Sequence, residues 1–373
     1  MDTKRNIGLD IIRVAAAMLV IICHSGFFSV GISFRFLSFA GVLAVEIFFA
    51  LSGLLVGKSL IQAVVGPEPG KALKKFYVNR LLRTLPLYYI MLLVTAVVSG
   101  KGIPLSCFVF LQNFSESDLS FLPVSWSLSV EAWFYFLIPP LFWLLYRLLS
   151  GKLGEKRAVY LTIGILCAIP FTLRLCSALV LATEWDYGIR KQIPLRLDAI
   201  MMGVFLAALK RYSGERYGRI APKGGCLLLS AGGIGGLYLF YCAWLVKESN
   251  FDSSPFWKVA FFTLLPLFCC LLVMYMENAT WNGKLRTVKA AKLICALSTL
   301  SYGVYLIQVC VFSVVSEYFV DARFAVSWLG FLASIALTVL LALAGYRLVE
   351  VPSARLRDKW LRKLDKTETV SNV

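Results

Sequence analysis

The chain has 373 residues, of which 59% are hydrophobic, and its mean hydropathy is +0.76. A water-soluble chain of this length does not need so much apolar surface, whereas runs of about 20 apolar residues, the length that crosses a bilayer, recur throughout it. The formal net charge of +17 would suit a nucleic-acid partner. However, the basic residues are distributed like those of membrane-protein loops, so no nucleic-acid partner is expected. The ten Cys residues form no CxxC pair or metal-binding spacing, and no metal site is predicted.

The apolar pattern predicts an all-α polytopic membrane protein with about ten transmembrane helices around a central polar cavity. The expected spans are Gly8–Phe28, Phe36–Val65, Leu85–Ser99, Trp126–Tyr146, Ala158–Leu181, Ile193–Leu209, Cys226–Val246, Phe256–Met276, Ala291–Ser316 and Ala325–Tyr346. The segment Ile103–Phe110 is too short to cross and is expected to be re-entrant or interfacial. Residues 1–350 are expected to form the transmembrane domain, and residues 351–373 a short basic cytoplasmic tail.

The orientation of these spans follows from the distribution of Lys and Arg. Both tails and every second loop are rich in basic residues, as in Lys71–Arg83 and Lys210–Lys223, while the alternate loops hold few. Because basic loops remain on the cytoplasmic side, both termini are predicted to be cytoplasmic. An even number of spans agrees with this orientation.

The first span contains two costly groups, Arg13 and His24, and His24 is the only histidine in the chain. They are eleven positions apart, which in a helix is about three turns plus 20°, so both are expected on one face about 16 Å apart. A lone histidine in an apolar helix is more often a packed residue, and an arginine near a helix end more often snorkels to the interface. The other buried charges bear on this choice.

The rise along each span predicts two levels of polar residues in the membrane. The level in the outer half contains His24, Glu46, Glu131, Arg196 and Asp198. The level near the cytoplasmic face contains Arg13, Arg80 and Arg83. An arginine-rich level suits phosphate recognition, and an imidazole with carboxylates suits general-base chemistry. The alternative is a set of unrelated ion pairs that tether helices.

These residues lie in motifs that resemble the acyltransferase-3 family of integral membrane acyltransferases. The motifs, in chain order, are GLDIIRVAAAMLVIICHSG, AVEIFFALSGLLVGKSL, FYVNRLLRTLPLYY, SWSLSVEAWFYFLIPPLF, LRLDAIMMGVFLA, LSYGVYLIQ and YRLVEVPSARL. Together they cover most of the chain, and their order and spacing are jointly specific. One departure is Gln308, at a position where family members often have a histidine.

The resemblance implies transfer of an acyl group, usually acetyl, from cytoplasmic acyl-CoA to a glycan hydroxyl, in the cytoplasmic (inner) membrane of a bacterium. Its implied partners are acyl-CoA, a glycan or lipid-linked sugar acceptor and the lipid bilayer, with no metal. The donor's phosphates would bind Arg13, Arg80 and Arg83, which leaves the thioester near His24. His24 would be the general base, oriented by Glu131 or Glu46. The acceptor would contact Trp126, Ser127, Arg196 and Asp198.

Several alternatives remain open from the sequence. The acyl group could pass covalently through His24 or a nearby hydroxyl instead of moving directly. The same buried His, Glu and Asp residues could also serve a proton-coupled transporter or flippase of a glycan or lipid precursor, or the protein could be a non-catalytic assembly partner. The sequence does not choose acetyl over succinyl, name the acceptor or give the oligomeric state.

Overall fold

The computed structural model describes residues 5–28, 31–114, 119–181, 183–245, 250–279, 289–319 and 324–371, and these contain helices and loops but no β-strand. Three basic residues that bear on the predicted orientation, Lys4, Lys284 and Arg286, lie outside the described residues. The helical elements are α1 (Ile7–Cys23), η1 (His24–Phe28), α2 (Phe34–Val65), α3 (Pro69–Ser99), α4 (Leu105–Phe108), α5 (Ser125–Leu179), η2 (Asp186–Arg190), α6 (Leu197–Tyr212), α7 (Gly214–Ile220), α8 (Gly224–Phe240), η3 (Tyr241–Leu245), α9 (Asn250–Ser253), α10 (Pro255–Asn278), α12 (Lys289–Ser316), η4 (Glu317–Phe319), α13 (Phe324–Gly345), η5 (Tyr346–Glu350) and α14 (Val351–Ser371).

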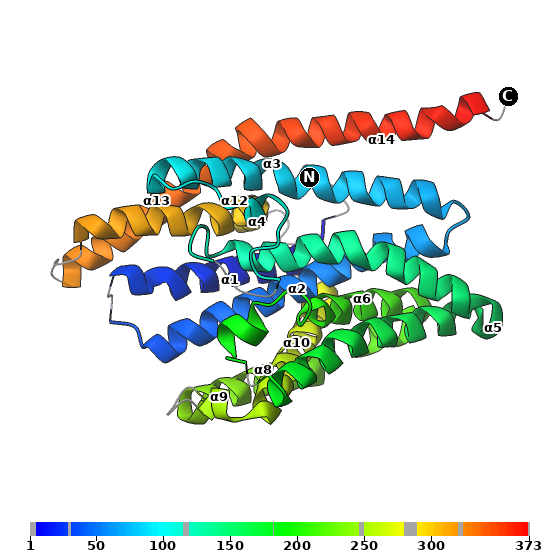
Figure 1. Cartoon of the computed structure of the whole chain (residues 1–373), viewed down its shortest axis with the longest axis horizontal. Coiled ribbons are helices and arrows are strands. Elements are labelled where there is room, and N and C mark those ends of the chain that lie inside the picture. The colour runs from blue at the N-terminus through cyan, green and yellow to red at the C-terminus, as the bar shows by residue number, and fades with distance from the viewer. Residues whose placement is uncertain are drawn as a thin grey trace.

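The predicted helical membrane class is confirmed, because eight helices of the described residues are long and apolar enough to cross a bilayer. Helix α5 is 55 residues long and contains two of the expected spans, because Gly154 adopts φ 72° and the chain doubles back there (Figure 1). Helix α6 has 16 residues and falls below spanning length. Ile103–Phe110 contains only the single turn α4. The count of about ten spans stays a prediction.

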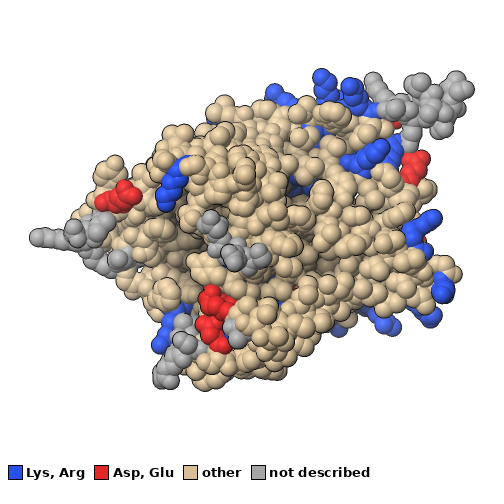
Figure 2. Space-filling view, in the orientation of Figure 1, with Lys and Arg blue, Asp and Glu red and all other residues tan. Residues whose placement is uncertain are grey.

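The long helices lie side by side, and α14 continues past α13 along the N-terminal part of α3 (Figure 1). We call the end of the bundle that contains residues 66–68, between α2 and α3, and the C-terminal part of α14 the basic end. Figure 2 shows Lys and Arg gathered there on the visible face. Helix α3 begins here with Pro69 in its first turn, where a missing N–H is not needed, and it ends at Gly100 in the left-handed conformation.

Helices α2 and α6 approach backbone to backbone at Gly53 and Gly203. A Cβ atom at Gly53 would meet the Ile200 carbonyl oxygen at 2.1 Å, and one at Gly203 would meet the Ala50 carbonyl oxygen at 2.5 Å. Small residues permit this contact, which is a common way to pack helices within membranes. The Gly53 of the ALSG segment therefore places the polar residues of α2 directly beside those of α6.

Candidate active site

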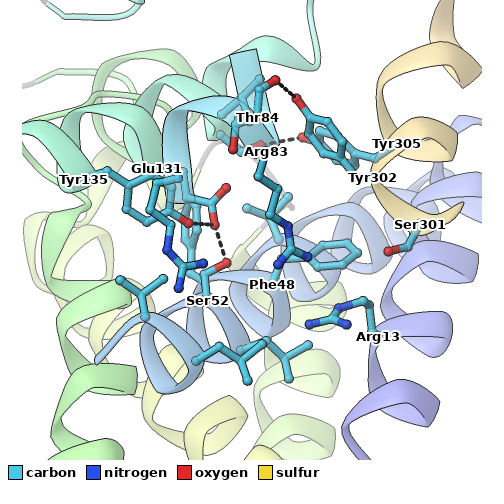
Figure 3. A pocket seen from close by; sticks show the side chains of 18 residues that line it. Arg13, Phe48, Ser52, Arg83, Thr84, Glu131, Tyr135, Ser301, Tyr302 and Tyr305 are labelled. Carbon is cyan, nitrogen blue, oxygen red and sulfur yellow. Dashed lines mark hydrogen bonds between the residues drawn. The ribbon is translucent and has the colours of Figure 1, made fainter. Parts of the chain in front are cut away.

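A cavity of about 130 Å³ lies among α1, α2, α3, α5 and α12, and we call it the arginine cavity (Figure 3). Its ionisable lining residues are Arg13, Arg80, Arg83, Glu131, Tyr135, Tyr302 and Tyr305. The side chains of Arg13 and Arg83 point into the same space, close to the Phe48 ring (Figure 3). The structure thus brings together the three arginines that the sequence assigned to the donor, from two different helices.

The three guanidinium groups differ in their partners. Arg13 donates to Ser298 Oγ at 3.3 Å and lies 3.8 Å from Asp10, whose carboxylate also binds Arg5 at 2.6 Å. Arg80 and Arg83 have no carboxylate within the 4.0 Å ion-pair distance among the described residues. The Arg80 guanidinium lies 5.9 Å from the ring centre of Phe76 and 5.8 Å from that of Tyr135. Arg80 and Arg83 are therefore available to an anion from outside the protein.

Glu131 lies in the same cavity with its carboxylate held by two hydroxyl groups. Ser52 Oγ and Tyr135 Oη both donate to Glu131 Oε1, the second at 2.8 Å. Tyr135 is one helical turn after Glu131, and Ser52 precedes the glycine that brings α2 against α6. Both donors bind the same oxygen of Glu131, so its other carboxylate oxygen remains available. Sequence reasoning missed Ser52 and Tyr135, although the i,i+4 spacing of Tyr135 could have identified it.

Two larger cavities adjoin the arginine cavity toward the basic end. The α14 cavity, about 400 Å³, lies between α2, α3 and α14. The α6 cavity, about 660 Å³, is lined by α1, α2, α6 and α10 and includes Asp10 and Glu277. Arg83, which is exposed, lines all three cavities. The arginine cavity therefore communicates at Arg83 with the space at the basic end.

His24 lies in a separate cavity of about 530 Å³, which we call the His24 cavity. The expected span Gly8–Phe28 corresponds to the apolar helical segment Ile7–Phe28, in which α1 ends at Cys23 and His24 starts the 3-10 turn η1. The His24 Nδ1 atom is buried and has no hydrogen-bond partner among the described residues, and the Gln308 side chain is next to the ring. Gln308 is fully buried, and its Oε1 atom likewise has no partner in the described part of the chain.

Only Val45 and Tyr305 line both the arginine cavity and the His24 cavity. Tyr305 Oη donates to the Val124 carbonyl oxygen at 2.9 Å and lies 2.6 Å from Ser127 Oγ. Arg13 and Glu131 are on one side of this barrier, and His24 is on the other. No direct hydrogen bond joins Glu131 to His24 among the described residues, because each carboxylate contact of Glu131 is made on the arginine side.

The other predicted site residues lie outside the arginine cavity or at its edge. Glu46 and Arg196 form an ion pair with 1% and 0% of their side chains exposed, and Arg196 also donates to the Phe262 carbonyl oxygen at 3.2 Å. Asp198 binds Arg174 at 2.7 Å and 3.1 Å. These two pairs tie α6 to α2 and to α5, and none of the four residues lines any of the four cavities described.

Arg174 was missed in the sequence, although an arginine within the expected span Ala158–Leu181 is the same kind of signal that identified Arg196. Trp126 lines the His24 cavity, and its ring lies 5.0 Å from the guanidinium of Arg190. Ser127, the next residue, lines the arginine cavity. The structure therefore places these two predicted acceptor contacts on opposite sides of Tyr305.

The fold and cavities define a polytopic helical membrane protein that holds three arginines and an imidazole in adjacent cavities inside the bundle. Residues 6–347 match the family described as an acyltransferase domain, acyltransferase-3, and the chain belongs to this family. The resemblance seen in the sequence motifs is thereby confirmed over nearly the whole chain.

Three relatives illustrate the similarity. A Staphylococcus aureus (strain COL) protein named as a putative O-acetyltransferase is 24% identical over 371 residues, which cover 92% of this chain and 56% of the relative. The O-acetyltransferase OatA of Staphylococcus aureus (strain NCTC 8325) is 22% identical over 377 residues, with the same coverage. A Bacillus subtilis (strain 168) protein named as a putative peptidoglycan O-acetyltransferase is 27% identical over 202 residues, or 48% of this chain and 29% of the relative. The chain thus spans just over half the length of the first relatives it matches, and no solved structure matches it.

Proposed function

We propose that this protein is a membrane O-acetyltransferase that moves an acetyl group from acetyl-CoA to a hydroxyl group of a cell-envelope glycan. Membership of the acyltransferase-3 family and the names of its relatives support the reaction class. The observation that carries the proposal is the position of Arg80 and Arg83, which have no ion-pair partner among the described residues. Arg80 lines the arginine cavity and the α14 cavity, and Arg83 lines all three cavities. Unpaired guanidinium groups are costly in a membrane protein unless an anionic ligand binds them.

The distribution of charge supports a direction for the reaction. Lys and Arg gather at the basic end, and by the positive-inside rule this end faces the cytoplasm of a bacterial cell (Figure 2). The donor then enters from the cytoplasm, where acyl-CoA is made. The His24 cavity lies toward the other side of the membrane, where an envelope glycan or a lipid-linked sugar is accessible.

On the donor side, Arg80 and Arg83 bind the phosphates of the donor, with Arg13 assisting from α1. Guanidinium groups suit this role because they form paired, charge-assisted hydrogen bonds with phosphate oxygens. The phosphopantetheine arm extends through the arginine cavity, over a distance comparable to the roughly 16 Å expected between Arg13 and His24. The thioester then arrives at Tyr305 and Ser127, at the boundary with the His24 cavity.

On the acceptor side, His24 takes the proton from the acceptor hydroxyl as its oxygen attacks the thioester carbonyl carbon. A new C–O bond forms, the C–S bond breaks, and the proton passes from the imidazolium to the departing CoA thiolate. Of the two carboxylates predicted to act with His24, we assign the role to Glu131, because it lines the arginine cavity. Glu46 instead forms an ion pair with Arg196. Trp126 contacts the acceptor in the His24 cavity, and Arg196 and Asp198 hold α6 behind it.

The experiment that tests this proposal is acetyl transfer by purified protein in nanodiscs supplied with radiolabelled acetyl-CoA and envelope glycans. We expect release of CoA that depends on the glycan, and labelled O-acetyl groups that mild base removes. Glycan flux across the membrane without CoA release would contradict the proposal and favour a transporter. Mass spectrometry of envelope glycans from cells with and without the gene identifies the acceptor.

A further inference from the structure

The α14 cavity has an unusually one-sided set of charges. Its ionisable lining residues are Lys75, Arg80, Arg83 and Arg357, and no acid lines it. By contrast, the α6 cavity also contains two acids, of which Asp10 pairs with Arg5 and Arg13, and Glu277 pairs with Lys210. Of the two cavities at the basic end, the α14 cavity therefore has the stronger preference for an anion.

Arg357 reaches this cavity because α14 is fixed against α3. Lys71 Nζ lies 4.0 Å from the Asp365 carboxylate, and Lys75 Nζ donates to the same group. Figure 1 shows α14 running alongside the N-terminal part of α3. The C-terminal segment, which the sequence suggests is a tail, is thus a wall of a cavity that contains Arg80 and Arg83.

The polar groups in this cavity are incompletely satisfied within the protein. The Arg80 Nε atom is buried and has no hydrogen-bond partner within the part of the chain that the structure describes. Arg357 donates to its neighbour Asp358 at 3.0 Å and 2.9 Å, but Asp358 is half exposed and does not line the cavity. A space of about 400 Å³ with several guanidinium donors and no carboxylate fits phosphate groups.

We infer that the α14 cavity binds the nucleotide phosphates of the acyl-CoA donor, and that α14 contributes Arg357 to this site together with Lys75 and Arg80. The inference rests on the proposed function and extends it, because it assigns part of donor recognition to the C-terminal helix. Arg83, which the α14 cavity shares with the arginine cavity, marks the path from the bound phosphates to the thioester end. The phosphate of an anionic lipid headgroup has the same chemistry, and the experiment separates the two sources.

The test measures the dissociation constant of acetyl-CoA for wild type, Arg357→Ala, Arg357→Lys and Arg355→Ala in nanodiscs of phosphatidylcholine alone. Arg355→Ala is the matched control, since Arg355 is exposed on the same helix and lines none of the cavities. Loss of a charge-assisted hydrogen bond is expected to weaken binding about tenfold in Arg357→Ala, with partial recovery in Arg357→Lys. Arg355→Ala is expected to bind like wild type. S-acetylpantetheine, which lacks the nucleotide, is expected to bind all four proteins equally.

The other outcomes are distinct. Wild-type affinity for acetyl-CoA in Arg357→Ala would overturn the inference while leaving the proposed function intact. An effect of Arg357→Ala that appears only when phosphatidylglycerol is added to the nanodiscs would assign the cavity to a lipid headgroup and also overturn it. Absence of acetyl-CoA binding in the wild type would contradict the proposed function itself, together with the inference that depends on it.

Discussion

The Tyr305 hydroxyl group lies 2.6 Å from Ser127 Oγ, at the boundary between the arginine cavity and the His24 cavity. Tyr305 also donates its single proton to the Val124 carbonyl oxygen at 2.9 Å, so Ser127 is the donor in the shared hydrogen bond. These two contacts fix a ring of α12 against the start of α5. Tyr305 and Val45 thus lie between the cavity that contains Arg13, Arg80 and Arg83 and the cavity that contains the only histidine of the chain.

Removing this ring should uncouple the two half-sites. In Tyr305→Ala the two cavities join, so water from the His24 side reaches the thioester and hydrolyses it. We expect the ratio of acceptor-independent CoA release to glycan acetylation to rise several-fold. Tyr305→Phe keeps the ring and should retain the barrier, although it loses the Ser127 contact. An unchanged ratio in Tyr305→Ala would show that the ring is no barrier.

Replacing either unpaired arginine should act on the donor. Arg80→Ala and Arg83→Ala are each expected to weaken acetyl-CoA binding by about 1.5–3 kcal/mol per charged hydrogen bond lost, or roughly 10- to 150-fold. Lysine should restore binding only in part, because it lacks the planar fork of donors. Direct binding measurements on purified variants check this, with the exposed Arg157→Ala as the control. Unaltered affinity in both alanine variants would rule out a donor role.

The buried pair of Glu46 and Arg196 should matter chiefly for stability. Glu46→Gln leaves the Arg196 charge buried without its partner, which is expected to cost about 3–5 kcal/mol. Combining it with Arg196→Met removes that charge and should recover part of the loss. The exposed pair of Glu155 and Arg211 provides the control, since Glu155→Gln should cost less than about 1 kcal/mol. Thermal unfolding in detergent measures each effect. A Glu46→Gln protein that melts like wild type but fails to transfer acetyl would instead place Glu46 in the chemistry.

The pH dependence of transfer should report on His24. Transfer should fall as the pH drops from about 8 to about 5, because a protonated imidazole cannot accept a proton and histidine ordinarily titrates near 6.5. The nearby Asp186 cannot cause this fall. Burial raises the pKa of the Asp186 carboxyl, but the positive charges of Arg190 and Lys191 outweigh burial and hold this pKa below its ordinary value. Its ionised form therefore stabilises the fold above about pH 3.9, the unfolded-state value, and this stabilisation is lost only as the pH falls further.

The measurement is a pH–rate profile at saturating acetyl-CoA. Wild type should show an acid limb, and Asp186→Asn should keep the shape of that limb. Profiles of Glu131→Gln and Glu46→Gln, recorded in parallel, identify which carboxylate is coupled to His24. A wild-type rate that does not change across this range would argue against an imidazole base.

The sequence predicted the class of fold and the kinds of groups in the site, because apolar runs and charges inside them are local signals. It identified Glu46 and Arg196 as buried but not as partners of one another. Their pairing depends on the rotation and closeness of α2 and α6, which are set by the contact of Gly53 with Gly203. Such a contact between distant segments has no local signature beyond the two glycines.

The depth of His24 and Glu131 was likewise inferred from the rise of a helix, which indicates height in the membrane but not what lies between two residues. The intervening group is Tyr305, an uncharged residue that a search for buried charges does not detect. The contact of α14 with α3 could not be predicted either, since a basic segment after the last span is ordinarily interpreted as a tail.

The measurement that tests the account most directly is acetyl transfer by purified His24→Ala, recorded beside its affinity for acetyl-CoA. His24 and the arginines proposed to bind the donor line different cavities, on opposite sides of Tyr305, so the variant should bind acetyl-CoA like wild type. Its transfer to glycan should be lost, since the chain has no other imidazole. Retained binding with abolished transfer is the result that the account predicts. Near-normal transfer by a well-folded His24→Ala protein would contradict it.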